Sequence, residues 1–268
     1  MPGRDVPGRD VTALHRPEDL AEPGVLEPAA MYPPLPEGEV PDAAVICFFP
    51  DTVRAVGERE GSDVAFSFTS IIGGQPCYVR EVAGRRIAFF FPEIGAPRAV
   101  MFLEEAIARG ISRFVAVGSA GVLVPSLVMG HPVVVTSALR DEGTSAHYGA
   151  TTSVVEAGAG GIRACVAALE AVGAAHERGR TWTTDGIYRE TRSTVARRIE
   201  AGCVLVEMEA SALLAVAAHR GVELGQILFS ADSLAGEEWD HRGWVGAGDA
   251  HERVFWIAMD AAARLAAG

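Results

Sequence analysis

The stretch Val204-Leu-Val-Glu-Met-Glu-Ala-Ser-Ala-Leu-Leu-Ala-Val-Ala-Ala-His219 decides the fold, because it passes from strand to helix with no turn residue between them. The run from Val204 to Val206 indicates a buried strand, and apolar residues recur at helical spacing after it. Glu207 and Glu209 flank Met208 at the change. Ligands of α/β sheets bind beyond the carboxyl ends of the strands. Two carboxylates there accept hydrogen bonds from hydroxyls, and a thioether packs on an apolar ring face, so the stretch favours a polyol site. Alternatively, Glu209 only complements the helix dipole and Glu207 is an exposed strand end.

Length and composition favour one large domain with a tail. The chain has 268 residues and a formal net charge of −12, which disfavours nucleic acid as a partner. No apolar run approaches the roughly 20 residues of a membrane helix, and the N-terminus lacks the apolar region of a signal peptide. We therefore expect a cytoplasmic protein with no membrane contact. The scattered cysteines predict small buried side chains in a reducing compartment, not disulfides or a zinc site. They are Cys47, Cys77, Cys165 and Cys203.

Residues 1–41 are predicted to be a flexible, proline-rich N-terminal arm, and residues 42–268 a single domain. The arm begins with the repeat Pro2-Gly-Arg-Asp-Val and Pro7-Gly-Arg-Asp-Val, which cannot form a regular core element, so we expect flexibility at least to Arg16. The apolar residues between Val25 and Tyr32 are expected to pack on the domain or on a neighbouring subunit.

Strands alternate with helices through the rest of the chain, which predicts a three-layer α/β/α domain with a central mixed sheet. The expected strands are 43–49, 78–82, 86–91, 113–117, 132–138, 178–183, 204–206 and 224–230. The second and third flank a turn at 83–85 and read as a hairpin. The expected helices are a short one from Val53, 97–109, 162–172, one ending near 201, one after Met208, and 249–267.

Polar residues gather where these strands end, as expected of a site on an α/β sheet. They are Asp51, Ser119, Asp185, Glu207 and Asp232. The sequence Gly118-Ser-Ala-Gly121 lets backbone amides and a hydroxyl approach an anion or a sugar oxygen closely, although a plain tight turn is the alternative. It is neither a Walker loop nor a nucleophile elbow.

Asp232 ends a strongly apolar strand, where desolvation raises the proton affinity of a carboxyl and suits it to general-acid catalysis. The alternative is a helix N-cap. His147-Tyr148 lies in a polar loop that is expected to close over a pocket. The seven histidines show no metal-ligand spacing, so we expect no metal.

These segments together resemble the nucleoside phosphorylase family from about Ala43 onward. The family comprises hexameric purine nucleoside phosphorylases, uridine phosphorylases and the related methylthioadenosine/S-adenosylhomocysteine nucleosidases. The similar segments are Val206-Glu-Met-Glu-Ala210, Gly118-Ser-Ala-Gly121, Gly95-Ala-Pro97, Ser230-Ala-Asp232 and Thr184-Asp185 followed by Ile187-Tyr188.

The resemblance implies a role for each matched residue. Met208, Glu209 and Ser119 bind the ribose, Glu209 at the 2′- and 3′-hydroxyls, with Glu207 supporting them. Gly118 and Ser119 face the nucleophile. Ile187 packs on the base beside Tyr188. Asp232 protonates the N7 atom of a purine, so that the base leaves as a neutral molecule while the ribose becomes oxocarbenium-like.

The phosphate side departs from the family pattern. The phosphorylases' Gly-Asp-Pro-x-Arg loop reads Pro50-Asp51-Thr52-Val53-Arg54 here, so Arg54 is kept and the glycine is lost. Ala116 stands where phosphorylases have a second arginine, and a third, from the neighbouring subunit, has no counterpart near Gly73. Each charge-assisted contact contributes about 1.5–3 kcal/mol, so two losses weaken phosphate binding by several kcal/mol. Nucleosidases use water instead, and Asp51 stands near their water-positioning acid. Residues Asp51, Arg54, Gly118 and Ser119 are therefore assigned to the phosphate or water side.

The sequence predicts a nucleoside phosphorylase that cleaves the N-glycosidic bond with phosphate as co-substrate and no cofactor. The Gln-x-Arg pair of uridine phosphorylases is not present at its spacing after Tyr188, where Arg189, Glu190 and Arg192 are the nearest polar residues. With Asp232 in place, the resemblance therefore favours a purine-like base over uracil. The expected assembly is a homo-oligomer, from dimer to hexamer, with sites near subunit interfaces. A hydrolase that uses water and a non-catalytic nucleoside-binding protein remain as alternatives.

Overall fold

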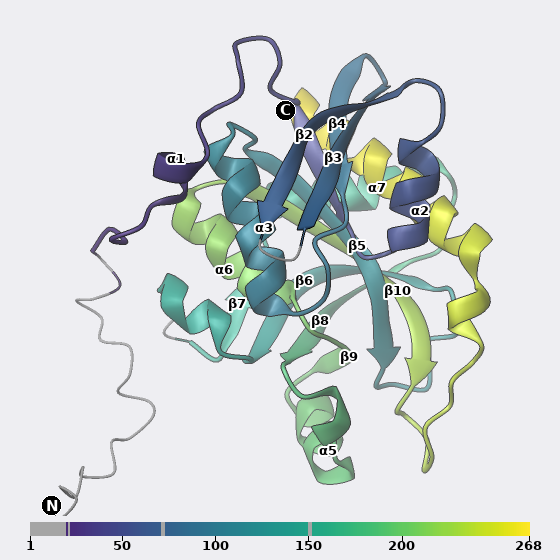
Figure 1. Cartoon of the computed structure of the whole chain (residues 1–268). Helices are drawn as coiled ribbons and strands as arrows, with labels where there is room; N and C mark the ends of the chain where they lie inside the picture. The colour runs from purple at the N-terminus through teal and green to yellow at the C-terminus, as the bar shows by residue number, and fades with distance from the viewer. Residues whose placement is uncertain (1–19, 21, 71–72, 150–151) are drawn as a thin grey trace, which may run out of the picture.

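The computed structural model describes residues 20, 22–70, 73–149 and 152–268 (Figure 1). The arm as far as Arg16 lies outside these residues. The strands are β1 (Ala43–Cys47), β2 (Ser62–Ser70), β3 (Gly73–Val82), β4 (Arg85–Phe90), β5 (Arg113–Val122), β6 (Pro132–Asp141), β7 (Val154–Glu156), β8 (Glu177–Thr184), β9 (Cys203–Glu207) and β10 (Glu223–Ser233). The α-helices are α1 (Pro28–Met31), α2 (Pro50–Gly57), α3 (Ala96–Ala108), α4 (Ala159–Ala171), α5 (Arg192–Glu200), α6 (Ala210–Arg220) and α7 (Gly248–Ala267). Short 3₁₀ turns are η3 (Thr144–Tyr148), η4 (Ile187–Arg189) and η5 (Trp244–Gly246).

The predicted three layers are confirmed. Every residue of β1 is buried, and its side chains alternate between two core clusters. Ala44 and Ile46 pack in the cluster that includes α3 and α6, whereas Val45 and Cys47 pack in the cluster that includes α2, α4 and α7. This period of two on a strand covered on both faces explains its uninterrupted apolar sequence.

The mixed sheet closes on itself in one half. β5 pairs with β10 in parallel and with β9 in antiparallel orientation. β10 continues to β6, β6 to β8, and β8 back to β9, so these five strands form a ring. The other half extends from β5 through β1, β4 and β3 to β2. The ring brings the ends of β5, β9 and β10 together.

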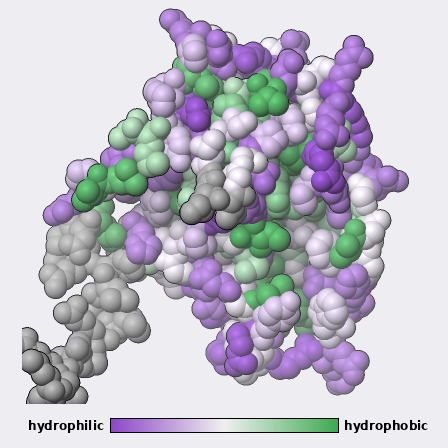
Figure 2. All heavy atoms as spheres, in the orientation of Figure 1, coloured by the Kyte–Doolittle hydropathy of each residue, from purple (hydrophilic) through white to green (hydrophobic). Residues whose placement is uncertain are grey.

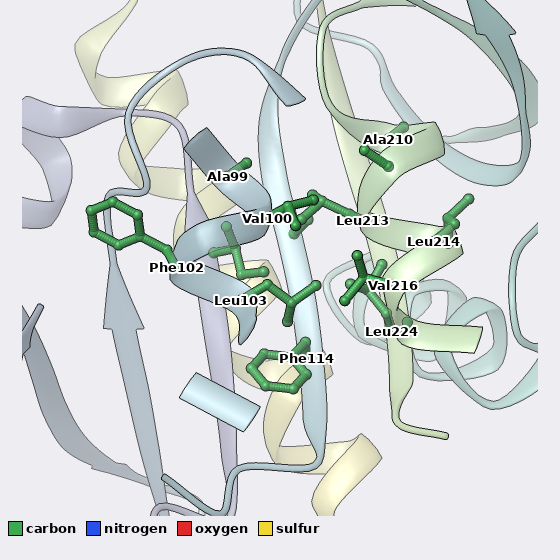
Figure 3. Close-up of a cluster of buried hydrophobic side chains, with 14 of the residues drawn as sticks. Ala99, Val100, Phe102, Leu103, Phe114, Ala210, Leu213, Leu214, Val216 and Leu224 are labelled. Atoms are coloured by element: carbon green, nitrogen blue, oxygen red, sulfur yellow. The ribbon is translucent and has the colours of Figure 1, made fainter. Parts of the chain in front are cut away.

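Helices α3 and α6 cover one face of the sheet and pack against each other (Figure 3). Val100 and Leu103 of α3 point toward Leu213 and Val216 of α6, above Phe114 of β5 (Figure 3). All five side chains are at least 96% buried. Full burial of such side chains contributes about 1.5–3 kcal/mol each.

The structure differs from the sequence predictions at several places, among them the short strand β7 (Val154–Glu156), which was not predicted. Gly118–Gly121 is not a turn but continues β5, which runs to Val122. Strand β2 (Ser62–Ser70) was not predicted. Helix α2 begins at Pro50 instead of Val53, since proline is tolerated in the first turn.

The cysteines are free and buried, as predicted. No helix in the described part of the chain has the length and apolar character needed to cross a bilayer. The same residues hold no group of three or more His, Cys, Asp and Glu side chains arranged to bind a metal.

The N-terminal segment from residue 22 to 41 lies along α3. Glu27 Oε2 forms an ion pair with Arg220 Nη1 at 3.1 Å, and the Arg109 guanidinium lies 5.7 Å from the Tyr32 ring centroid. Hydrophobic side chains show on this segment at the left of the space-filling view (Figure 2). Val25 and Leu26 are exposed, so the segment offers apolar surface beyond what it buries on α3.

Candidate active site

A cavity of about 490 Å³ lies where the ends of β5, β9 and β10 meet. It contains most of the residues that the sequence assigned to a site. Those lining it are Asp51, Gly118, Ser119, Ile187, Glu207, Met208, Glu209 and Asp232. Arg54 and Tyr188 do not line it, and Asp185 lies outside it, where its carboxylate accepts the Gly143 N–H at 3.0 Å.

Glu207 is the acid that holds the start of α6. Its Oε2 accepts the backbone N–H of Glu209 at 2.7 Å and that of Ala210 at 2.6 Å, and its Oε1 accepts the Thr183 hydroxyl at 2.7 Å. Glu207 is 7% exposed, and burial raises its pKa despite these donors. It is therefore neither an exposed strand end nor free to accept a sugar hydroxyl. Its described contacts make it a positioning residue.

The Glu209 carboxyl is held by the backbone that precedes α3. Its Oε1 accepts the backbone N–H of Gly95 at 2.6 Å, immediately before α3 begins. Gly95 has φ +98°, a conformation that favours glycine, and Pro97 occupies the first turn of the helix. Burial, and then the charge of Glu207, raise the pKa of Glu209 to about 8. The carboxyl thus stays protonated at neutral pH until a ligand or a cation compensates its charge.

Glycines let the strands of the ring approach the cavity closely. A Cβ on Gly118 would lie 3.0 Å from the Phe48 Cβ, and one on Gly121 would lie 2.8 Å from a methyl carbon of Leu234. The close approach is thus a property of β5 itself and not of a turn. It leaves Ser119 half-buried in the cavity wall.

Asp232 is the next-to-last residue of strand β10 and does not cap a helix. Its Oδ2 accepts the indole N–H of Trp239 at 2.6 Å, from the segment that follows β10. Trp239 is 60% exposed, so this hydrogen bond fixes the carboxyl at the open side of the cavity.

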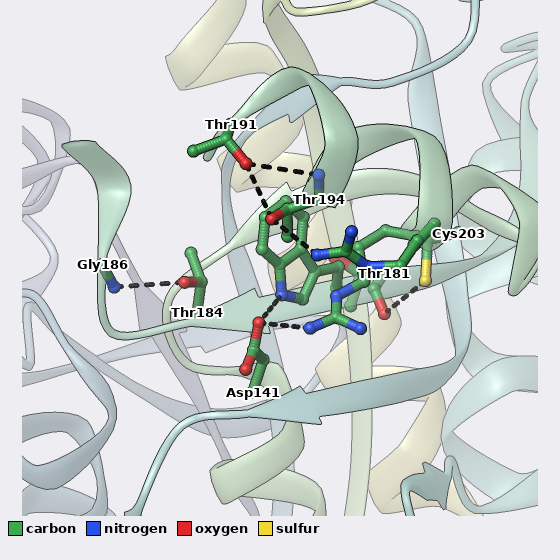
Figure 4. Close-up of polar contacts among 10 residues, drawn as sticks. Asp141, Thr181, Thr184, Gly186, Thr191, Thr194 and Cys203 are labelled. Atoms are coloured by element: carbon green, nitrogen blue, oxygen red, sulfur yellow. Dashed lines mark hydrogen bonds and ion pairs between the residues drawn. The ribbon is translucent and has the colours of Figure 1, made fainter. Parts of the chain in front are cut away.

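The segment after β8 carries Ile187 and is fixed by hydroxyl contacts (Figure 4). Thr184 Oγ1 accepts the Gly186 N–H at 3.1 Å, and Thr191 Oγ1 caps α5 by accepting the Thr194 N–H at 3.3 Å. Ile187 lines the cavity from this segment. Tyr188 is 95% exposed and does not line it.

The phosphate side of the cavity has no cation among its described lining residues. Arg54 Nη2 forms an ion pair with Asp51 Oδ1 at 2.6 Å in the first turns of α2, and its side chain is 66% exposed. Ala116 stands in register with Gln226 on β10, whose buried Oε1 has no partner within the described residues.

Several cavity residues were not assigned from the sequence. Glu190, Gln226 and His251 line the cavity but belong to no recognisable motif. His251 stacks on Phe49 with ring centroids 4.3 Å apart, and burial lowers its pKa. The predicted loop residues His147 and Tyr148 line a different groove, beside α3 and the N-terminal segment.

Comparisons with known proteins agree with this architecture. The model of the phosphorylase superfamily matches residues 42–267. A guanosine phosphorylase of Halorubrum lacusprofundi is 30% identical over 183 residues, which cover 64% of this chain and 73% of that protein. A uridine phosphorylase of Salmonella typhimurium is 27% identical over 161 residues, covering 55% of this chain and 64% of that protein.

The fold is also that of a solved structure. The crystal structure of uridine phosphorylase from Vibrio fischeri superposes with a TM-score of 0.73 at 23% sequence identity, covering 87% of this chain and 95% of that one. The match of the family model to residues 42–267 shows that the chain belongs to the phosphorylase superfamily and is an enzyme of the nucleoside phosphorylase family.

Proposed function

We propose that the enzyme cleaves the N-glycosidic bond of a purine (deoxy)ribonucleoside with phosphate, giving the free base and ribose 1-phosphate. The observation that carries this proposal is the convergence of Glu209, Met208, Ser119 and Asp232 on one cavity from three different strands of the ring. No cofactor or metal enters the proposed reaction.

The sugar is assigned to Met208 and Glu209. The thioether offers an apolar surface to the ribose ring, and the Glu209 carboxyl offers hydrogen bonds to the 2′- and 3′-hydroxyls. Gly95 fixes one oxygen of Glu209, so this group is oriented before the substrate binds. Such preorganisation avoids the entropy of ordering the side chain during catalysis.

The base is assigned to the side of the cavity that holds Ile187 and Asp232. Asp232 donates its proton to N7 while the bond from C1′ to N9 breaks and its electron pair passes to the base. The base leaves neutral, and a phosphate oxygen attacks C1′ of the oxocarbenium-like sugar. General-acid catalysis of this kind contributes typically 10²–10⁴-fold.

Phosphate is assigned to the end of the cavity formed by Asp51, Thr52, Gly118 and Ser119. A phosphate dianion needs positive charge there, and the described wall supplies none. Arg54 lies two residues beyond Thr52, and its guanidinium supplies this positive charge when it leaves Asp51. A second subunit is the other source, and the apolar N-terminal segment is consistent with a homo-oligomer whose sites lie near an interface. We expect such an assembly in the cytoplasm.

The test is a panel of guanosine, inosine, adenosine and uridine, assayed with and without phosphate, in which ribose 1-phosphate and free ribose are separated. We expect phosphate-dependent release of a purine base. Free ribose formed at equal rates without phosphate would instead indicate a hydrolase, and binding without turnover of any nucleoside would indicate a binding protein. The Asp232→Asn variant should lose purine cleavage, while Glu200→Gln, an exposed change on α5, should not.

A further inference from the structure

The polar loop after β6 carries a carboxylate, Glu142, that the proposed reaction does not use. Its Oε1 accepts the Ser211 hydroxyl of α6 at 2.8 Å and also the Ser145 hydroxyl, and its Oε2 accepts the Ser145 N–H at 2.9 Å. Ser145 and Ser211 are fully buried. Hydrogen bonds to an ionised acceptor are stronger than those between neutral groups. Glu142 therefore fixes η3 to the first turn of α6.

Thr183 of β8 also holds the first turn of α6. Its hydroxyl accepts the Ser211 N–H at 2.9 Å and donates to Glu207 Oε1 at 2.7 Å. Glu207 Oε2 in turn accepts the Glu209 N–H at 2.7 Å. Ser211 is thus held at its backbone by Thr183 and at its side chain by Glu142. These contacts join Glu142 to Glu209 in a continuous chain of hydrogen bonds.

The hydroxyl protons of this chain are all used. A hydroxyl has one proton to donate, and Thr183 donates its proton to Glu207 while Ser211 donates its proton to Glu142. Neither hydroxyl can turn to another acceptor without depriving a carboxylate of a hydrogen bond. Because these groups are buried, such a loss is unfavourable, and the first turn of α6 has one preferred position.

The position of this turn decides where the Glu209 carboxyl lies in the cavity. Glu209 immediately precedes α6, and its Oε1 is fixed by the Gly95 N–H at 2.6 Å. With that oxygen fixed, a shift of the first turn of α6 changes the direction of the oxygen that is left for the sugar hydroxyls. Hydrogen bonds weaken steeply when their angles depart from the preferred geometry. The strength of the sugar contact therefore depends on how firmly Ser211 is held.

We propose that Glu142 is a positioning residue for the sugar, and that it acts through the Ser211 hydroxyl to keep Glu209 in reach of the 2′-hydroxyl. This inference rests on the proposed function, because it uses the assignment of Glu209 to the ribose. It goes further in giving the loop after β6 a role, although Glu142 is not among the residues that line the cavity. Glu142 thereby sets the preference between ribonucleosides and 2′-deoxyribonucleosides from outside the cavity.

The experiment measures kcat/KM with phosphate for inosine and 2′-deoxyinosine, with uridine and 2′-deoxyuridine as a second pair. Ser211→Ala should lower the ratio of ribonucleoside to deoxyribonucleoside by about 3- to 10-fold, because the contact to the 2′-hydroxyl exists only in the ribonucleoside. Ser137→Ala is the matched control and should leave the ratio unchanged. Ser137 is a buried serine of β6 that accepts the Arg180 Nε–H at 3.0 Å and does not line the cavity.

The double variant of Ser211→Ala and Glu142→Ala tests the route. If Glu142 acts through Ser211, the double variant should change the ratio no more than the larger of the two single changes. Glu142→Gln keeps an oxygen that accepts the Ser211 hydroxyl, so its ratio should stay closer to wild type than that of Glu142→Ala. Ser211→Ala removes a single hydroxyl and remains a test if Glu142→Ala does not fold. An unchanged ratio in Ser211→Ala, or changes that add in the double variant, would overturn the inference.

Binding without turnover separates this inference from the proposed function. Calorimetric titration of inosine and 2′-deoxyinosine, in the absence of phosphate, needs no chemistry. If the wild type cleaves neither nucleoside yet binds inosine more tightly, and Ser211→Ala reduces that difference while Ser137→Ala does not, the proposed reaction fails and the role of Glu142 stands. If phosphate-dependent cleavage occurs and Ser211→Ala leaves the ratio unchanged, the reaction stands and the role of Glu142 fails.

Discussion

The backbone N–H of Glu209 donates to the carboxylate of Glu207 at 2.7 Å, so the first acid of the Glu-Met-Glu sequence holds the second in place. The same carboxylate oxygen accepts the Ala210 N–H, and the first turn of α6 therefore starts on a buried negative group. A negative charge at a helix N-terminus is favourable, and its hydrogen bonds satisfy donors that have no partner within the helix. In the proposed reaction, Glu207 therefore acts on the sugar through Glu209.

Glu207→Gln should therefore reduce stability and sugar binding together. The amide nitrogen must face either the two backbone N–H groups or the Thr183 hydroxyl, which already accepts the Ser211 N–H at 2.9 Å. One donor is left without an acceptor, at a cost of about 1–3 kcal/mol. Urea denaturation should show this loss, and the nucleoside KM should rise because Glu209 shifts. A variant with wild-type stability would contradict the helix-holding role.

Glu209→Gln should change the pH dependence of stability. The pKa of Glu209 is raised from its ordinary value of 4.5 to about 8, so ionisation is less favourable in the folded protein than in the unfolded chain. This residue therefore lowers stability progressively as pH rises from about 4.5 to 8. The variant should gain on the order of 2–4 kcal/mol relative to wild type between pH 5 and pH 8.5.

The measurement is the free energy of unfolding at pH 5, 7 and 8.5. The charge of Glu207 is one cause of the raised pKa of Glu209, so the difference reports the ionisation of the two carboxyls together. A flat difference for Glu209→Gln would show that the carboxyl is ionised in the folded protein.

Trp239→Phe should lower kcat by about tenfold with little change in nucleoside KM. The indole N–H holds Asp232 at 2.6 Å, and a general acid that is poorly positioned transfers its proton less efficiently. Because Trp239 is mostly exposed, the variant should fold normally. Trp256→Phe is the control, since that indole donates to Glu252 at 3.1 Å outside the cavity. Equal kinetics of the two variants would remove Trp239 from catalysis.

Arg54→Ala should raise the KM for phosphate by about tenfold or more and leave the nucleoside KM nearly unchanged. The exposed ion pair with Asp51 contributes at most about 1 kcal/mol to stability, so the variant should remain folded. Arg264→Ala removes a comparable exposed pair, with Asp260, on α7. If phosphate KM is the same in both variants, the cation at the nucleophile comes from elsewhere.

Local patterns in the sequence were sufficient to predict most elements and the convergence of the strand ends. The change from strand to helix at Val206–Ala210 could be predicted because the apolar residues of β9 before it and of α6 after it follow the strand and helix patterns clearly. The roles of the two acids could not be assigned from local chemistry, because they depend on which carboxylate reaches the helix N–H groups. That depends on Thr183 and Gly95, which lie far from the two acids in the sequence.

Non-local pairing explains the remaining differences. Gly118–Gly121 reads as a turn, yet it stays extended because β10 pairs along it and β9 pairs at Gly121. Glu190 belongs to no motif. It lines the cavity because contacts distant in the sequence hold the start of α5 against the segment after Asp232. Strand β2 contains the sequence Val64-Ala-Phe-Ser-Phe68, in which Phe66 and Phe68 alternate with other residues and are buried on one face.

The closed ring of β5, β10, β6, β8 and β9 constrains the strands of this enzyme more than the connections that lie outside the ring. Its members have no free edge at which to shift register, so Met208 and Glu209, which we propose to bind the sugar, follow β9 in a fixed frame. Glu190 and Trp239 lie instead on connections outside the ring. A change in these connections therefore alters the wall and the open side of the cavity without rebuilding the frame.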